Sequence, residues 1–124
     1  MATILIVVDE EAMARWLPEH FVEAGWDVRL VRSEEDALAL LEDEETQRLP
    51  DAAIVDAVLG EVSGFALIQD IRRRVPGAFI VCASARAGGV ARMKALAAGA
   101  NAYITKPFAL GDIDLLLKER GEVS

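Results

Sequence analysis

Hydrophobic residues in this chain gather into short blocks of strand length, which alternate with longer amphipathic segments. Most of these blocks are continuous apolar runs, as is typical of parallel strands covered on both faces. The predicted strands are Thr3 to Val8, Trp26 to Val31, Ala52 to Asp56, Ala78 to Ala83 and Ala102 to Thr105. The alternation of strand and helix from end to end predicts an α/β fold with one parallel sheet.

The segments between the strands have helical periodicity. The five expected helices end at Gly25, after Leu41, before Pro76, at Gly99 and near Arg120. Ser33 followed by Asp36 predicts an N-cap for the second helix. Pro18 lies inside the first helix, where its missing N–H predicts a kink or a local break. Right-handed crossovers between the strands place helices on both faces, which makes the sheet doubly wound.

Length and charge narrow the class of protein. The 124 residues, 53% of them hydrophobic, predict a single domain over residues 1–124 with no output domain. The net charge of −8 argues against direct nucleic-acid contact, because phosphate binding needs clustered cations. We find no signal peptide and no apolar run near the ~20 residues that span a bilayer, so we expect a cytoplasmic protein without membrane contact. The single cysteine, Cys82, is expected in the core.

Polar side chains directly follow several of the predicted strands. Asp9 and Glu10 follow the first strand, Asp56 ends the third, Ser84 follows the fourth and Lys106 follows the fifth. The carboxyl ends of parallel strands meet at the edge where such sheets bind ligands. Crowded carboxylates need a cation or a proton between them, and their oxygens suit Mg²⁺. Together these residues supply a nucleophile, a metal site and a cationic clamp for phosphoryl transfer onto a carboxylate.

Four segments, ILIVVDEE, AAIVDAVLGEVSGFAL, IVCASARA and GANAYITKPF, resemble the successive signature segments of response-regulator receiver domains. The resemblance covers nearly the whole chain, in family order and spacing. It implies a flavodoxin-like fold with strand order 2-1-3-4-5 and phosphorylation of Asp56 by a histidine kinase or phosphotransfer protein. Such a domain is not an enzyme in the usual sense, because it catalyses only its own phosphorylation and dephosphorylation.

The resemblance also assigns roles at the sheet edge. It implies that Asp56 is the phosphoacceptor and that Mg²⁺ is bound by Asp9, Asp56 and the Val58 carbonyl. The phosphate-binding or switch residues would be Ser84, Lys106 and Tyr103, and the rate of hydrolysis would be tuned by Val58 and Arg86. Pro107 would follow a cis peptide bond. For Tyr103, the alternative of a half-exposed strand tyrosine carries equal weight. The surface of the fourth helix, fifth strand and fifth helix is expected to contact a downstream protein, and a homodimer through that surface is a further option.

Two positions depart from the family pattern. The acidic pair would occupy positions 8 and 9, but position 8 is Val8, so one metal-site acid is expected to be lost and Mg²⁺ binding to be weak. Glu10 is a candidate substitute, although we expect its side chain to point towards the start of the first helix. Gly60 replaces the usual proline in the loop after Asp56. The loss at position 8 leaves a second hypothesis open, a pseudo-receiver that binds partners without phosphorylation.

Other functions and features have simpler interpretations. A flavin-binding electron carrier would need a hydroxyl- and glycine-rich phosphate loop after the first strand, which is missing. An independent phosphatase would need a second aspartate two residues after Asp56, where Val58 stands. We expect His20 to be half-buried with a satisfied imidazole. Arg72, Arg73 and Arg74 end the third helix and are expected to face water.

Overall fold

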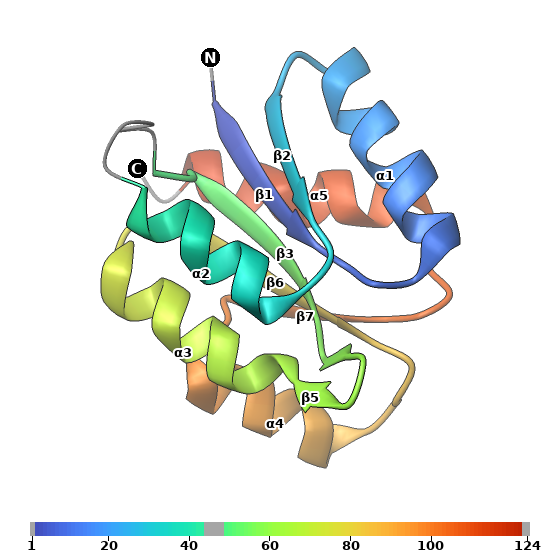
Figure 1. Ribbon diagram of the computed structural model, residues 1–124. Helices are drawn as coiled ribbons and strands as arrows, with labels where there is room; N and C mark the ends of the chain where they lie inside the picture. The colour runs from blue at the N-terminus through green and yellow to red at the C-terminus, as the bar shows by residue number, and fades with distance from the viewer. Residues whose placement is uncertain (1, 44–48, 123–124) are drawn as a thin grey trace.

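The computed structural model describes residues 2–43 and 49–122, in which five parallel strands form one sheet between two layers of helices (Figure 1). The sheet strands are β1 (Thr3–Val7), β2 (Asp27–Val31), β3 (Ala52–Asp56), β6 (Phe79–Ser84) and β7 (Ala102–Thr105). The helices are α1 (Glu11–Glu23), α2 (Glu34–Glu42), α3 (Gly64–Arg74), α4 (Gly89–Ala98) and α5 (Leu110–Glu122). The order β2-β1-β3-β6-β7 confirms the predicted doubly wound topology.

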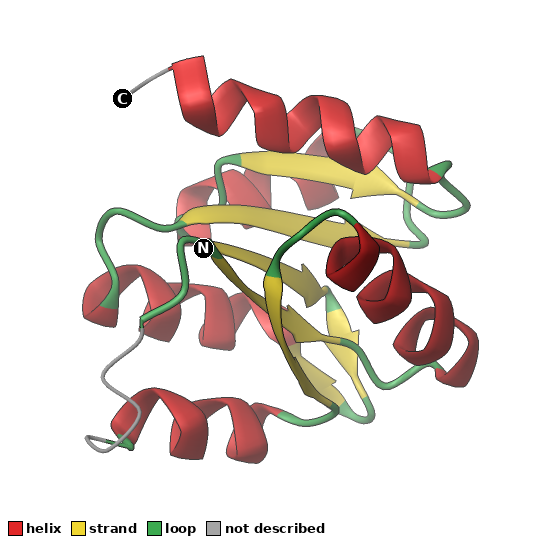
Figure 2. Cartoon of the chain, turned by 90° about the horizontal axis from the view of Figure 1, so that it is seen from above, coloured by secondary structure: helices red, strands yellow, loops and turns green. Residues whose placement is uncertain are grey.

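Helices cover both faces of the sheet (Figure 2). Alternating side chains of the strands fill an apolar layer on each face. Along β1, Leu5 and Val7 face the layer under α2, α3 and α4. Ile4 and Ile6 face the layer under α1 and α5. Both layers are almost free of exposed atoms, so the central strands are covered on both sides, as their continuous apolar sequences predict.

Local structure follows the sequence signals in most places, although β2 begins one residue later than predicted and β6 is shifted by one residue. Ser33 Oγ accepts the Asp36 N–H at 3.1 Å, which confirms the predicted N-cap. The first strand ends at Val7 instead of Val8, and α1 runs through Pro18 without a break. A short antiparallel hairpin of β4 (Val58–Leu59) and β5 (Val62–Ser63), which the sequence analysis did not predict, connects β3 to α3.

Arg72 corrects one expectation, because it does not face water. Its guanidinium donates to the carbonyl oxygens of Gly99, Pro76 and Ala78 and to Asn101 Oδ1, at 2.5–3.0 Å. The reason is that the chain turns back beneath the end of α3, which aims these carbonyls at the arginine. Arg72 thereby fastens the end of α3 to the loops that lead into β6 and β7.

His20 and Cys82 lie as the sequence predicts. His20 Nε2 lies 2.8 Å from Asp114 Oδ1, linking α1 to α5, and the His20 side chain is 21% exposed. Cys82 is buried on β6, and burial together with the negative charge of Asp56 raises the pKa of its thiol to about 12. The thiol is therefore protonated at neutral pH. Within the described part of the chain, no helix combines the length and apolar content that a membrane crossing requires.

Candidate functional site

Asp56 is the centre of the polar cluster at the carboxyl edge of the sheet. It ends β3, and its side chain is buried, with the whole residue 4% exposed. Lys106 Nζ donates to Asp56 Oδ2 at 2.7 Å. Both residues reach the same edge because β3 pairs with β6 and β6 with β7, and the Lys106 N–H donates to the Ser84 carbonyl at 2.8 Å. A nearly buried carboxylate is thus held against one ammonium group.

The charge of Lys106 is stabilised by its acidic neighbours. Burial by itself would lower the pKa of this ammonium group, but the hydrogen bond and negative charge of Asp56, with a smaller contribution from Glu10, raise the pKa above its ordinary value of 10.5. Lys106 is therefore fully protonated at neutral pH. A fixed positive charge beside Asp56 could stabilise the negatively charged oxygens of a phosphoryl group transferred to it.

Asp9 is fixed through the loop after Asp56. Its Oδ2 accepts the Gly60 N–H at 2.6 Å. Gly60 has φ +64°, a conformation that glycine adopts without strain, so the residue in place of the family's proline turns its N–H towards Asp9. Arg32 donates to the backbone carbonyl of Asp9 at 2.8 Å. The sequence analysis missed Arg32, because nothing in the local sequence connects the start of α2 with this turn.

Val8 does not face the acidic edge in the structure. Its side chain is fully buried in the layer under α1 and α5, in the same cluster as Met13 and Leu17. It continues the alternation of the β1 side chains that point into this layer. Position 8 therefore belongs to the core, and an acid there would enter that core instead of the site.

Glu10 also lies elsewhere than expected. It precedes α1 as the N-cap residue, but its side chain makes no capping hydrogen bond. Instead its Oε2 lies 3.4 Å from Lys106 Nζ. The acidic pair at the edge of the sheet is therefore Asp9 and Glu10, and Lys106 lies between the carboxylates of Glu10 and Asp56.

Gly64 is a further site residue that the sequence analysis missed. It begins α3, and a Cβ built on it would lie 2.0 Å from the carbonyl oxygen of Asp56. Its N–H donates to the Ala57 carbonyl at 2.8 Å. Only glycine allows α3 to start this close to the phosphoacceptor candidate. The available signal was a glycine directly after Ser63, whose hydroxyl accepts the Phe65 N–H as a helix cap.

Ser84, Arg86 and Tyr103 form a connected set beyond Asp56. Ser84 is buried, and its Oγ accepts the Arg86 N–H at 3.1 Å. The Tyr103 hydroxyl donates to the Arg86 carbonyl, so the backbone of Arg86 is held from both sides. Tyr103 therefore contacts the loop after Ser84. The Lys106–Pro107 peptide bond is cis, at the position that the family resemblance indicates.

The free carboxylate oxygens at this edge are compatible with Mg²⁺. Asp9 and Asp56 each use Oδ2 for a protein donor, and neither Oδ1 has a hydrogen-bond partner within residues 2–43 and 49–122. The same ranges contain no group of three His, Cys, Asp or Glu side chains close enough to hold a metal ion alone. Mg²⁺ prefers few protein ligands and several waters, so two carboxylates with backbone and water oxygens suit it.

Comparison with known sequences identifies a protein family and relatives that are similar to this chain. The family model of the response regulator receiver domain matches residues 4–118. The KDP operon transcriptional regulatory protein KdpE of Escherichia coli is 34% identical over 120 residues, covering 95% of this chain and 50% of that protein. The phosphate regulon transcriptional regulatory protein PhoB of Rhizobium meliloti is 34% identical over 116 residues, covering 89% and 48%. The chain thus spans about half the length of these relatives.

Solved structures agree with the sequence relatives. A response regulator protein from Burkholderia pseudomallei, crystallised with a phosphorylated aspartic acid, a calcium ion and citrate, superposes with a TM-score of 0.86 at 27% identity. The match covers 99% of this chain and 71% of that one. A receiver domain protein from Methanospirillum hungatei superposes with a TM-score of 0.84 at 26% identity, covering 100% and 99%.

Proposed function

This chain belongs to the response regulator receiver domain family, and from that premise we propose that it is a phosphorylation-controlled switch whose acceptor is Asp56. The phosphoryl donor is a phosphohistidine of a histidine kinase or a phosphotransfer protein. One observation carries the proposal: a nearly buried aspartate at the end of β3 is paired with Lys106 at 2.7 Å. A buried carboxylate that served structure alone would not need the exposed acids Asp9 and Glu10 beside it.

The transfer is a substitution at phosphorus, in which each site residue has a role. A free oxygen of Asp56 attacks phosphorus, the P–N bond to the donor breaks, and its electron pair returns to the imidazole ring. Lys106 binds a phosphoryl oxygen, and the Ser84 hydroxyl donates a hydrogen bond to another. Asp9, Asp56 and the Val58 carbonyl would hold Mg²⁺, and the ion would neutralise phosphoryl charge. Glu10, whose carboxylate lies 3.4 Å from Lys106 Nζ, is the candidate to bind a water of the ion.

The output of the switch is a changed protein surface. If Ser84 turns towards a phosphoryl oxygen, its Oγ leaves the Arg86 N–H, and the loop that Tyr103 holds is released on one side. The adjoining surface of α4, β7 and α5 already exposes apolar side chains, since Met93 on α4 is 70% exposed and Leu115 on α5 is 63% exposed. We propose that a downstream protein or a second copy of the chain binds there.

Mass spectrometry tests the acceptor directly. Incubation with Mg²⁺ and acetyl phosphate or phosphoramidate should add one phosphoryl mass to the intact protein, and hydroxylamine should remove it, as expected for an acyl phosphate. Asp56→Asn should abolish the addition, whereas Asp36→Asn, on the exposed first turn of α2, should leave it unchanged. A phosphoryl group that persists in Asp56→Asn would place the acceptor elsewhere.

Two residues beside the site bear on the lifetime of the phosphoaspartate. Val58 has no polar atom to orient a hydrolytic water, and Arg86 could cover the phosphoryl group as a bidentate donor. We therefore propose a slow dephosphorylation, which Val58→Asn should accelerate. Equal or slower decay in Val58→Asn would contradict this role.

The pseudo-receiver alternative rested on the loss of an acid at position 8. The burial of Val8 in the core and the position of Glu10 beside Lys106 support the phosphorylated switch over a domain that works without phosphorylation. The two hypotheses separate in the same experiment, since a pseudo-receiver would take up no phosphoryl group.

A further inference from the structure

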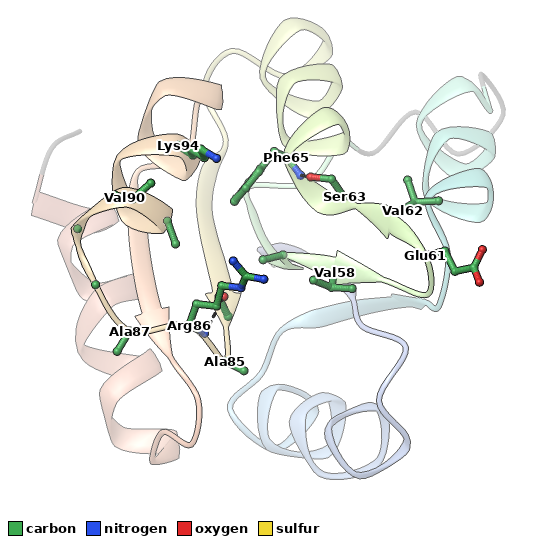
Figure 3. Close-up of a pocket in the computed structure, with 15 residues that line it drawn as sticks. Val58, Glu61, Val62, Ser63, Phe65, Ala85, Arg86, Ala87, Val90 and Lys94 are labelled. Carbon is green, nitrogen blue, oxygen red and sulfur yellow. Dashed lines mark hydrogen bonds between the residues drawn. The ribbon is translucent and has the colours of Figure 1, made fainter.

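A surface groove adjoins the phosphoacceptor site between the β4–β5 hairpin and the start of α4 (Figure 3). It has a volume of about 620 Å³, and Ala57 and Ser84 belong to its lining. Val58 from the hairpin, Phe65 from α3 and Val90 from α4 supply apolar walls. Val58 is 59% exposed and Val90 is 70% exposed. Exposed apolar side chains gathered around a hollow mark a surface that contacts another molecule.

The same groove carries positive charge without internal partners. Arg86 and Lys94 line it, and within the described residues neither side chain has an ion pair or a hydrogen bond, although the whole chain has a net charge of −8. Figure 3 shows the side chains of Arg86 and Lys94 directed into the groove. The acidic residue of the lining, Glu61, points away from it (Figure 3). The two cations are therefore available to an external anion.

Apolar walls combined with unpaired cations define what the groove can bind. We propose that it binds an acidic segment of a partner protein, which inserts an apolar side chain between Val58 and Val90 and directs carboxylates towards Arg86 and Lys94. A protein segment fits better than a small ligand because the outer wall is open and its apolar surface continues along α4 to Met93, which is 70% exposed. This surface shares Met93 on α4 with the surface proposed for output, but it extends from there to the β4–β5 hairpin instead of to β7 and α5.

The groove and the phosphoacceptor share Ser84, although the binding itself does not rest on the proposed phosphorylation. Ser84 lines the groove and holds the Arg86 N–H at 3.1 Å. The experiment therefore uses unphosphorylated protein, so that failure of phosphorylation and failure of binding remain distinguishable.

Three short synthetic peptides serve as probes in an NMR titration. The first has a Leu-Leu-Phe centre flanked by glutamates, the second has the same centre flanked by lysines, and the third has glutamates around Ser-Ser-Ser. We expect the first peptide alone to shift the amide resonances of Val58, Arg86 and Val90 in a saturable manner. Its affinity should fall with added salt, because exposed charge pairs are screened.

Variants of the cations provide the decisive comparison. Arg86→Ala combined with Lys94→Ala should weaken binding of the glutamate–Leu-Leu-Phe peptide by about tenfold, which corresponds to ~1.4 kcal/mol. Arg92→Ala is the control, since Arg92 is an exposed cation on α4 outside the groove lining, and it should bind as the wild type does. Equal binding of all three peptides, an equal loss in Arg92→Ala, or shifts that map to α5 instead of the groove would overturn the proposal.

Discussion

The apolar layer under α1 and α5 meets the acidic edge of the sheet at the end of β1, where adjacent residues belong to different regions. Val8 is fully buried in the layer, whereas Asp9 and Glu10 are exposed at the edge. In the layer a side chain stabilises the fold through close packing and the burial of apolar surface. At the edge the side chains act through their charges, which face water and one another. Introducing an acidic side chain in the apolar layer should therefore lower the stability of the fold, whereas changing an acidic side chain at the edge should alter ligand binding.

The largest expected effect is that of Val8→Asp, which would bury an unpaired carboxylate in the layer. We expect the free energy of unfolding to fall by about 4 kcal/mol, because an uncompensated buried charge costs several kcal/mol. Urea unfolding followed by circular dichroism measures this change. Val8→Ala should cost only about 2 kcal/mol, since it removes apolar contact without adding charge. A stable Val8→Asp protein that binds Mg²⁺ more tightly than the wild type would show that position 8 faces the edge.

Gly64→Ala should destabilise the contact between the start of α3 and Asp56 at the end of β3. The added Cβ would lie 2.0 Å from the Asp56 carbonyl oxygen, so α3 must move away from β3. We expect a loss of about 2–3 kcal/mol in the free energy of unfolding, as for other overpacked positions. Gly77→Ala is the matched control, because nothing lies within 4 Å of a Cβ there. If both variants are equally stable, the start of α3 is not constrained by Asp56.

The sequence sufficed for the fold because the signals for the fold are local. Continuous apolar strands, helix caps and the order of the segments specify the layers and the topology, and Ser33 capped its helix as predicted. The hairpin of β4 and β5 escaped prediction because its strands have two residues each, too few for a periodic pattern. Pro18 is accommodated within a continuous α1, so the packing of that helix outweighs the lost hydrogen bond.

The site was predictable in its membership but not in its geometry. Asp56, Ser84 and Lys106 end or follow strands, and parallel strands bring such residues to one edge. Which residue after β1 faces that edge depends on where the strand ends, and strand ends are the least certain feature of a sequence pattern. The sequence pattern extended the first strand to Val8, whereas β1 ends at Val7 and the Glu10 carboxylate lies 3.4 Å from Lys106 Nζ.

The ion pair at the edge should appear in the pH dependence of stability. The pKa of Lys106 is raised in the folded protein, so its ammonium group stabilises the fold below pH 10.5 and loses that contribution as the pH rises through the folded value. Lys106→Met should therefore be less stable than the wild type at pH 8, and the two free energies of unfolding should converge in strongly alkaline solution. Lys94→Met, which removes a lysine that has no ion pair among the described residues, should show no such convergence. Parallel curves for Lys106→Met and the wild type would contradict the pairing with Asp56.

The smallest expected effect concerns Glu10, whose exposed carboxylate lies beside Lys106 at the edge where we propose the Mg²⁺ site. Glu10→Gln should weaken Mg²⁺ binding by about fivefold, or ~1 kcal/mol, because an exposed charge contributes modestly. Its stability should stay within about 0.5 kcal/mol of the wild type, as for other surface changes. The amide resonance of Gly60 reports the binding, since its N–H donates to Asp9 Oδ2. Glu11→Gln is the control, because Glu11 is also exposed, begins α1 directly after Glu10, and has no ion pair with Lys106 within the described residues. An equal loss of affinity in both variants would mean that Glu10 acts only through the general negative field, and the acidic edge would then consist of Asp9 and Asp56.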